Sequence, residues 1–294
     1  YLPIGSDERV FCVLPFHYSY GNSLLLTHVA RGGCVVVDNR FAYPSAVVEH
    51  MAESRATSFA GVPSTYAILA ARTDFLGRDW PHLRYLTQAG GAMTRALQQR
   101  LRDALPGRIA LFVMYGQTEA GARLSYVPPD RLRDKFGSIG IGIPGVALTV
   151  RRPDGTECDV EEVGEVVARG DNVMQGYWND PEETAQVLRD GALYTGDLGK
   201  RDRDGYIWVV DRIKNMIKAG ANRVSAKEVE EVIAEVPGVQ EVCVVGVPDE
   251  LLGEAIEAYV VPQPGGGYSE TAVLQHCREQ LALYKIPRVV HAID

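Results

Sequence analysis

The residues best suited to chemistry in this sequence form the run Tyr-Gly-Gln-Thr-Glu at positions 115–119. The run follows an apolar stretch at 109–114 that is typical of a buried strand, and α/β sheets place ligand contacts at strand ends. The Tyr115 ring offers a face for stacking on a purine. The Thr118 hydroxyl can donate to a phosphate, and the Glu119 carboxylate can hold Mg²⁺ beside phosphate oxygens. The same residues are also compatible with an ordinary polar turn.

Three further segments carry residue types that suit a nucleotide. The run Ala-Gly-Gly-Ala at 89–92 has adjacent glycines that allow close approach of a planar ligand, or simply form a tight turn. Asp197, in the loop 194–199, can accept hydrogen bonds from a ribose diol or cap a turn. Arg212 presents a planar fork of donors to a hydroxyl or phosphate, or forms an interdomain ion pair.

The composition limits the classes of partner. The chain has 294 residues, 46% hydrophobic residues and a formal net charge of -8. Such an acidic balance argues against general binding of nucleic acid or of anionic membranes, both of which favour a basic face. The apolar runs are far shorter than the roughly 20 residues of a membrane-spanning helix. A local basic cluster, which is either a solvated face or a place for a phosphate-bearing partner, contains Lys214, Lys218, Arg223 and Lys227 around Gly220.

The cysteines indicate a reducing compartment. There are five of them, widely scattered and with no Cys-x-x-Cys pair, which is not the pattern of a disulfide framework. No signal-peptide pattern opens the chain. A cytoplasmic protein with reduced thiols is therefore predicted.

Alternating strands and helices must position these segments. Apolar runs typical of buried strands occur at 10–14, 34–38, 57–61, 84–87 and 109–114, with helix-like stretches between them at 23–30, 44–54 and 94–104. Crossovers of this length join parallel strands. The first part of the chain is therefore predicted to be an α/β domain with a mostly parallel sheet.

The pattern changes twice after this domain. From Phe136 to Val210 short β-type runs at 147–150, 164–169 and 206–210 are separated by Pro-Asp-Gly and Asp-Gly turns, which predicts a small antiparallel β-subdomain. After Asp211 helices are predicted at 226–235 and 270–283, and strands at 239–247 and 255–262. This last part is predicted to be a compact α+β domain.

Taken in order, these segments resemble one family. The run YGQTEA at 115–120 matches its YGxTE core motif, and the run YTGD at 194–197 matches its TGD motif. The run DRIKNMIK at 211–218, followed by Gly220 and by EVE at 228–230, matches its hinge segment. From about Val10 onward the chain is similar to the adenylate-forming superfamily, which includes acyl-CoA synthetases, AMP-forming acyl ligases, luciferases and peptide-synthetase adenylation domains.

The resemblance implies a nucleotide site. In the family, the tyrosine at the position of Tyr115 stacks on adenine, with the glycine-rich run 89–92 on its other side. Thr118 would touch the α-phosphate and Glu119 would be the Mg²⁺ ligand, and Asp197 and Arg212 would bind the ribose hydroxyls. The full set of implied ATP, AMP and thiol contacts is Gly90, Gly91, Ala92, Tyr115, Gly116, Gln117, Thr118, Asp197, Arg212 and Gly220.

The resemblance also implies a domain organisation. Residues 1–135 would be the second half of a large α/β domain, 136–210 its β-subdomain, and 215–294 a mobile small domain. Residues 211–214 would be the hinge, with Lys214 at the position where the small domain rotates between two half-reactions. Gly220 would line the tunnel through which a thiol arrives.

An acid pocket is implied less directly. The run PFHYSYG at 15–21 resembles the family segment at the pocket mouth, although its spacing from His to Gly is often one residue shorter there. His17, Tyr18 and Gly21 are the candidate pocket residues, and His17 is the candidate gate. A packed aromatic cluster is the alternative. Phe16, Tyr18 and Tyr20 together hint at an apolar acyl or aryl substrate.

The implied activity is ligation of a carboxylic acid to a thiol. The acid and ATP give an acyl-adenylate and pyrophosphate, and the thiol of CoA, or of a phosphopantetheine on an acyl carrier protein, then attacks. Such ligases act, among other settings, in fatty-acid metabolism. Two alternatives stay open: an enzyme dedicated to loading a carrier protein, and a truncated protein that binds nucleotide without catalysis.

Two family elements are not found in the sequence. The Ser/Thr/Gly-rich phosphate loop and the terminal Gly-Lys dipeptide with its adenylating lysine are both absent, and Lys285 is not assigned to that role. We therefore expect these 294 residues to belong to a longer polypeptide. The measurement that tests this expectation is the intact mass of the purified protein.

Overall fold

A computed structural model describes residues 1–220 and 222–293; the side chain of Lys214 lies outside the described part. The chain forms two compact units, and each is described by itself. The first comprises Tyr1–Thr195 and Gly199–Val209, and the second comprises Gly196–Leu198 and Val210–Asp294.

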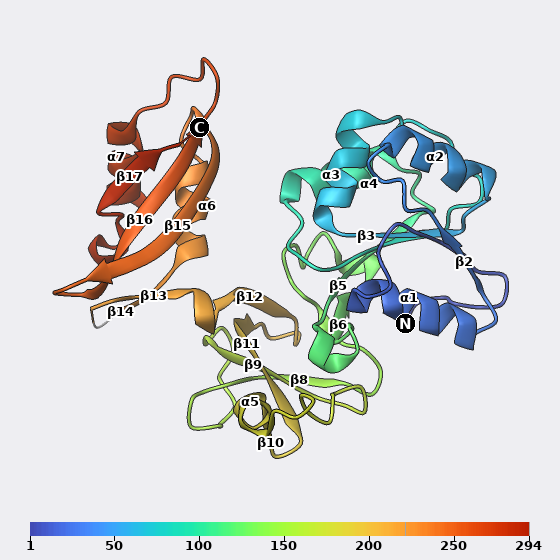
Figure 1. Ribbon diagram of the computed structural model, residues 1–294, viewed down its shortest axis with the longest axis horizontal. Helices are drawn as coiled ribbons and strands as arrows, with labels where there is room; N and C mark the ends of the chain where they lie inside the picture. Colours follow the sequence, from blue (N-terminus) through green and yellow to red (C-terminus); the bar gives the residue numbers. More distant parts are fainter. Residues whose placement is uncertain (221, 294) are drawn as a thin grey trace. The chain divides into compact units, whose positions relative to one another are not determined.

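The first unit is built on a seven-stranded sheet (Figure 1). Its strands are β1 (Arg9–Cys12), β2 (Cys34–Val37), β3 (Ser58–Gly61), β4 (Tyr85–Gln88), β5 (Ala110–Tyr115), β6 (Ser125–Val127) and β7 (Ile141–Gly142). The spatial order is β2-β1-β3-β4-β5-β6-β7. The pairs from β2 to β5 are parallel, whereas β6 and β7 pair antiparallel. The prediction of a mostly parallel sheet is confirmed.

Helices cover both faces of this sheet (Figure 1). They are α1 (Ser19–Ala30), α2 (Pro44–Glu53), α3 (Pro63–Arg72) and α4 (Arg95–Ala104). Side chains of α2, α3 and α4 share one core cluster, and those of α1 belong to another on the opposite face. Strand β1 serves both, since Phe11 joins the first cluster and its neighbours Val10 and Cys12 join the second. This is the alternation that a pleated strand imposes on successive side chains.

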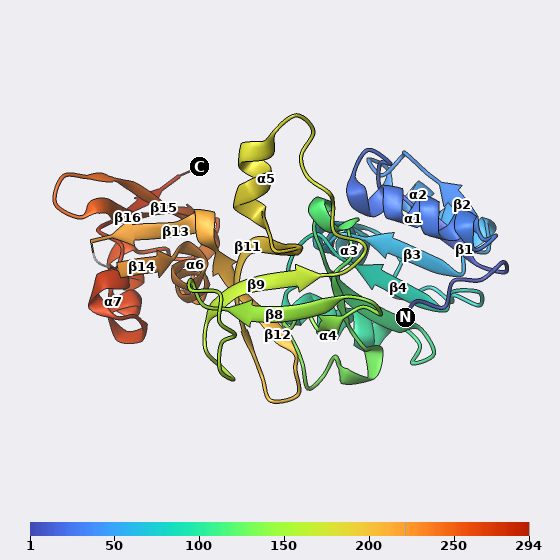
Figure 2. The ribbon, with the colours of Figure 1, turned by 90° about the horizontal axis from the view of Figure 1, so that it is seen from below.

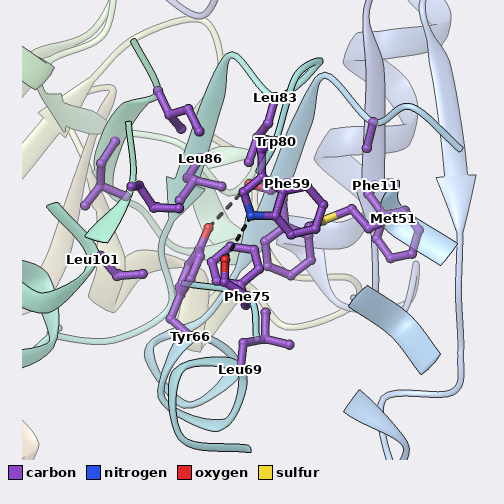
Figure 3. Close-up of a cluster of buried hydrophobic side chains, with 14 of the residues drawn as sticks. Phe11, Met51, Phe59, Tyr66, Leu69, Phe75, Trp80, Leu83, Leu86 and Leu101 are labelled. Carbon is purple, nitrogen blue, oxygen red and sulfur yellow. Dashed lines mark hydrogen bonds between the residues drawn. The ribbon is translucent and has the colours of Figure 1, made fainter. Parts of the chain in front are cut away.

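Aromatic rings fill the larger cluster (Figure 3). Phe59 is fully buried, with its ring centroid 5.6 Å from that of Tyr66 and 6.2 Å from that of Phe75. The polar atoms of the cluster have partners: the Tyr66 hydroxyl donates to the Thr87 carbonyl oxygen at 2.8 Å, and the Trp80 Nε1 donates to the Phe75 carbonyl oxygen at 2.9 Å. The cluster therefore gains apolar burial without leaving these donors unsatisfied.

Two of the helices on this sheet differ from the prediction. Helix α1 begins at Ser19, four residues before the predicted start at 23. Helix α3 begins at Pro63 and was not predicted, although Pro63 occupies its first turn and Thr65, Tyr66 and Leu69 are buried at helical spacing. The short apolar run at 66–70 has no charged residue opposite, so a helical face was not evident from polarity alone.

The rest of the first unit includes most of a second, five-stranded sheet, whose strand β12 ends in the second unit. Its elements are β8 (Ala147–Arg151), β9 (Gly164–Arg169), α5 (Pro181–Val187), β10 (Leu188–Arg189), β11 (Ala192–Arg201) and β12 (Ile207–Arg212). Strands β8 and β9 lie side by side and run antiparallel (Figure 2). The prediction of an antiparallel β-subdomain is confirmed, and helix α5 within it was not predicted.

The second unit is a sheet with two helices packed on one face. Its elements are β13 (Met216–Ala219), β14 (Asn222–Ser225), α6 (Ala226–Ala234), β15 (Val239–Asp249), β16 (Gly253–Pro262), α7 (Glu270–Gln280) and β17 (Val289–Ala292). Val229 and Ile233 of α6 and Val273 and Cys277 of α7 lie in its core. The α+β character predicted for this part is confirmed. Among the described residues, we found no helix with the length and hydropathy that crossing a membrane requires.

A buried carboxylate after β2 predicts a pH-dependent contribution to stability. Asp38 accepts hydrogen bonds from Arg40 Nη2 at 2.6 Å and from His50 Nδ1 at 2.7 Å, and Arg40 above all holds the pKa of Asp38 far below its usual range. Asp38→Asn is expected to lower the free energy of unfolding at pH 7 by about 2 kcal/mol.

The sign of this effect follows from the direction of the shift. Because the folded-state pKa lies below the unfolded one, the ionised carboxylate stabilises the fold above about pH 4 and loses this contribution as the pH falls further. Urea unfolding at pH 7 and at pH 3 measures it. The exposed Asp79, as Asp79→Asn, is the control, and a wild-type-to-variant difference that is equal at both pH values would contradict the assignment.

Candidate functional site

The motif 115–119 leaves the sheet at the carboxyl end of β5. Tyr115 is the last residue of that strand, and a short 3-10 helix, Thr118–Ala120, follows. The Leu124 backbone N–H donates to the Tyr115 carbonyl oxygen at 2.9 Å, which closes the turn. A Cβ on Gly116 would lie 2.2 Å from the Ala122 carbonyl oxygen, so this turn requires glycine. The tight turn therefore determines the positions of the Tyr115 ring and the Glu119 carboxylate.

The glycine-rich run lies at the carboxyl end of the neighbouring strand β4. Gly90, Gly91 and Ala92 are exposed, and the Gln88 side-chain amide donates to the Gly91 carbonyl oxygen at 2.7 Å. Gly90 has a φ of +82°, a backbone conformation that favours glycine. Strands β4 and β5 are parallel neighbours, so this run and the motif 115–119 leave the sheet at the same edge.

The start of α1 meets both segments. A Cβ on Gly90 would lie 2.5 Å from the Tyr18 hydroxyl, so the Tyr18 phenol packs against that glycine. The Thr118 hydroxyl donates to the Ser19 hydroxyl oxygen at 3.1 Å. Three segments that are far apart in the sequence therefore converge at one sheet edge, which is where open α/β sheets bind ligands.

The remaining residues of the predicted acid-pocket segment divide between surface and interior. His17 is exposed, and Tyr18 is half-buried. Gly21 is buried in α1, where a Cβ would lie 2.3 Å from the Pro15 carbonyl oxygen. The Tyr20 side chain is buried in the core, and its hydroxyl pairs with the Thr87 hydroxyl at 2.6 Å. Burial raises the pKa of the Tyr20 phenol.

Glu119 has a partner that the sequence analysis missed. The Tyr177 hydroxyl donates to Glu119 Oε1 at 2.7 Å, and the Met174 backbone N–H donates to the Glu119 carbonyl oxygen at 2.8 Å. The signal available in the sequence was the Gly-Tyr pair at 176–177 after a predicted strand. A glycine before an aromatic residue in a loop lets the backbone adopt conformations that other residues disfavour, and these can direct the aromatic side chain toward a neighbouring segment.

The Glu119 carboxylate could provide one protein ligand to a Mg²⁺ ion. Among the described residues, no group of three or more His, Cys, Asp or Glu side chains is gathered for a metal. Mg²⁺ in nucleotide sites takes one or two carboxylates and completes its shell with phosphate oxygens and water. The half-buried Glu119 carboxylate suits that role.

The other predicted nucleotide contacts lie in the second unit. Asp197 is buried, and its Oδ1 accepts a hydrogen bond from Arg212 Nε at 2.8 Å. The Arg212 side chain is otherwise largely exposed. The predicted interdomain ion pair is thus a pair within one unit. Its geometry leaves the outer edge of the guanidinium available to a hydroxyl or phosphate oxygen.

The hinge segment ends in a β-hairpin. Lys214 lies in a 3-10 helix, Ile213–Asn215, between β12 and β13, and its side chain is outside the described part. Gly220 has a φ of +63° in the turn after β13, and its N–H donates to the Leu252 carbonyl oxygen at 2.7 Å. Lys218 and Arg223 of the basic cluster face each other across the hairpin.

Comparison with known proteins agrees with this arrangement. Residues 1–178 match the family model described as AMP-binding enzyme, and residues 228–294 match the AMP-binding enzyme C-terminal domain. The chain is 36% identical to a feruloyl-CoA synthase of Amycolatopsis over 292 residues, which are 99% of this chain and 59% of that protein. It is 33% identical to an indoleacetate–CoA ligase of Aromatoleum aromaticum, over 99% of this chain and 56% of that protein.

Solved structures are similar as well. The o-succinylbenzoate coenzyme A synthetase of Bacillus subtilis, in complex with ATP and magnesium, gives a TM-score of 0.87 at 30% identity, covering 100% of this chain and 59% of that one. An amide bond synthetase of Marinactinospora thermotolerans gives 0.85 at 32% identity, covering 98% of this chain and 58% of that one. This chain spans less than two thirds of the length of each of these relatives. The AMP-binding enzyme model matches more than half of the residues of this chain. The chain belongs to the AMP-binding enzyme family.

Proposed function

We propose that the natural protein activates a carboxylic acid with ATP and transfers the acyl group to the thiol of CoA. The observation that carries this proposal is the convergence of Tyr115, Glu119 and the glycine-rich run 89–92 at one sheet edge. An aromatic ring, an open glycine backbone and a carboxylate there suit adenine, its neighbouring backbone and a phosphate-bound cation. The names of the relatives, which are CoA synthases and ligases, support the choice of acceptor.

In the first half-reaction an oxygen of the acid attacks the α-phosphorus of ATP, and the bond to the bridging oxygen breaks so that pyrophosphate leaves with the electron pair. Tyr115 would stack on one face of adenine, with Gly90, Gly91 and Ala92 on the other face. Gly116 and Gln117 would hold the backbone that follows Tyr115. Thr118 would donate to an α-phosphate oxygen. A Mg²⁺ held at Glu119 would supply neutralisation of phosphate charge, and positioning together with charge stabilisation would account for the catalysis.

In the second half-reaction the thiolate attacks the carbonyl carbon of the acyl-adenylate, and AMP leaves. Asp197 and Arg212 would hold the ribose hydroxyls through both steps, because their mutual hydrogen bond already orients the carboxylate. We propose that Lys214 is the hinge and that Gly220 lines the thiol tunnel. We propose the division into 1–135, 136–210, 211–214 and 215–294, of which the boundary after 210 lies next to the boundary between compact units at Val209 and Val210.

Substrates and acceptors are separated by direct assay. Pyrophosphate exchange by the natural protein with ferulate, indoleacetate and long-chain fatty acids tests the class of acid, for which His17, Tyr18 and Gly21 are the proposed pocket residues. Thioester formation with free CoA, compared with a phosphopantetheinylated carrier protein, tests the acceptor. AMP binding without exchange, in a protein whose mass is near 32.2 kDa, would favour the binding-only alternative. We also propose a cytoplasmic location, which the free thiols of all five cysteines support.

The stacking role of Tyr115 predicts a selective effect on the nucleotide. Tyr115→Ala is expected to raise the KM for ATP roughly tenfold and to change the KM for the acid little, because stacking of a base on an aromatic ring contributes about 1–3 kcal/mol. Steady-state kinetics with each substrate varied in turn measures it. Tyr115→Phe, which keeps the ring, is the matched control and should stay near the wild type. Equal rises in both KM values would contradict the stacking assignment.

A further inference from the structure

The segment between β9 and α5 forms hydrogen bonds with the turn that contains Glu119. The Asn172 side-chain amide donates to the carbonyl oxygens of Ala120 at 2.9 Å and Arg123 at 2.8 Å. Two residues further on, the Met174 N–H donates to the Glu119 carbonyl oxygen at 2.8 Å. A segment about 50 residues away in the sequence therefore makes polar contacts with the turn after β5. These contacts reach both the backbone of the turn and the side chain of Glu119.

Local backbone geometry determines where Tyr177 stands. Gly176 has a φ of +149°, and a Cβ there would lie 2.9 Å from Thr184 Cγ2. The Tyr177 N–H donates to the Thr184 hydroxyl at 2.9 Å, and that hydroxyl donates to the Asp180 carbonyl oxygen at 2.6 Å. Asp180 in turn caps α5 by accepting from the Glu183 N–H at 3.0 Å. The start of α5 therefore anchors the backbone of Tyr177.

The side chain of Tyr177 ends on the proposed cation ligand. Its hydroxyl donates to Glu119 Oε1 at 2.7 Å, and both side chains are half-buried. A tyrosine phenol keeps its proton at neutral pH, so the Tyr177 hydroxyl is the donor and the Glu119 carboxylate is the acceptor. An ionised carboxylate has about four acceptor positions. One hydrogen bond from a phenol therefore leaves acceptor capacity for a cation.

We propose that Tyr177 is a positioning residue for Glu119, which holds the carboxylate in one orientation so that it receives the Mg²⁺ of a bound nucleotide without first being ordered. This inference rests on the proposed function and extends it to a residue outside the 115–119 motif. Ordering a free glutamate side chain costs conformational entropy, and a hydrogen bond already present in the ligand-free protein removes part of that cost.

The test is the Mg²⁺ dependence of ATP binding and of pyrophosphate exchange in the natural protein. Tyr177→Phe keeps the ring and removes the hydroxyl, and the Mg²⁺ concentration at half-saturation is expected to rise roughly tenfold. The KM for the acid should not change. Titration calorimetry of ATP at several Mg²⁺ concentrations gives the same quantity without turnover. A Tm within a few degrees of the wild type shows that the variant folds.

A double-mutant cycle separates this role from a structural one. In a Glu119→Gln background the further change Tyr177→Phe is expected to alter Mg²⁺ half-saturation less than twofold, because the carboxylate that Tyr177 orients is gone. Tyr259→Phe is the matched control, since Tyr259 also donates to a glutamate, Glu257 Oε2 at 3.2 Å, in the second unit. It should leave the Mg²⁺ dependence unchanged.

Each result has one meaning. An unchanged Mg²⁺ half-saturation in Tyr177→Phe overturns the proposal while leaving the proposed function intact. An equal effect of Tyr177→Phe in the wild-type and Glu119→Gln backgrounds also overturns it, because the effect would not pass through Glu119. Failure of the wild-type protein to bind ATP with Mg²⁺ at all overturns the proposed function instead.

Discussion

Glu119→Gln is expected to lower the rate of ATP–pyrophosphate exchange by about 10²- to 10³-fold. The substitution keeps the size of the side chain, but it replaces one acceptor oxygen by an amide NH2 donor and removes the negative charge that a phosphate-bound cation requires. The loss should be larger than that in Tyr177→Phe, because the latter changes only the orientation of the ligand. The measurement is exchange of labelled pyrophosphate into ATP at saturating acid.

Controls make this result specific to one carboxylate. Glu182→Gln removes an exposed carboxylate from the first turn of α5, close in sequence to Tyr177, and should leave exchange within twofold of the wild type. Glu119→Asp keeps the charge on a shorter side chain and should retain part of the activity, with the deficit reduced at high Mg²⁺. Exchange within threefold of the wild type in Glu119→Gln would remove Glu119 from the proposed site.

The second large effect concerns stability. Phe59→Ala is expected to lower the free energy of unfolding by about 3–5 kcal/mol, because it removes a ring that is fully buried among other rings (Figure 3). The ring centroid of Phe11 lies 6.3 Å from that of Phe59, and the rings of Tyr66 and Phe75 also pack against Phe59. Because the strand backbone of β3 is paired on both sides, the neighbours have little room to collapse into the cavity.

Urea unfolding, followed by circular dichroism, measures this loss. Tyr43→Ala removes an aromatic ring that is 71% exposed in the same unit, and it should change the free energy of unfolding by less than about 0.5 kcal/mol. A change below about 1 kcal/mol in Phe59→Ala would show that the cluster does not pack as described.

Much of the fold was predictable because local patterns report it directly. The parallel strands are short apolar runs separated by stretches long enough for a helical crossover, and each of the predicted strands from 10–14 to 109–114 overlaps an observed one. Helix α4 shows why boundaries can be read as well. The sequence predicts that it starts at Thr94, and in the structure the Thr94 hydroxyl accepts a hydrogen bond from the Leu97 N–H as an N-cap.

What was missed lacked a local signature. Helix α5 is short and has no buried residue among those described, so no apolar stripe marked it. Helix α3 is as long as α2 and α4, but it has no charged residue before Arg72 to mark a polar face. The sequence groups Tyr20 with Phe16 and Tyr18, because spacing alone does not show which way α1 faces the sheet. The burial of Tyr20 beside Thr87 results from packing between two elements that are 67 residues apart. Local periodicity cannot specify such a pairing.

The sequence by itself determined the family and the candidate nucleotide residues, because the motifs at 115–119, 194–197 and 211–218 are contiguous runs in which residue type and spacing carry the chemistry. Only the tertiary structure decided which side chains act on one another. Tyr177 hydrogen-bonds to Glu119, which is 58 residues earlier in the sequence. Tyr18, at the start of α1, packs on Gly90, which follows the end of β4. Such contacts depend on strand order, on loop conformation and on the close approach that Gly90 and Gly176 permit. These are properties of the folded chain as a whole, because each requires several segments to be in place at once.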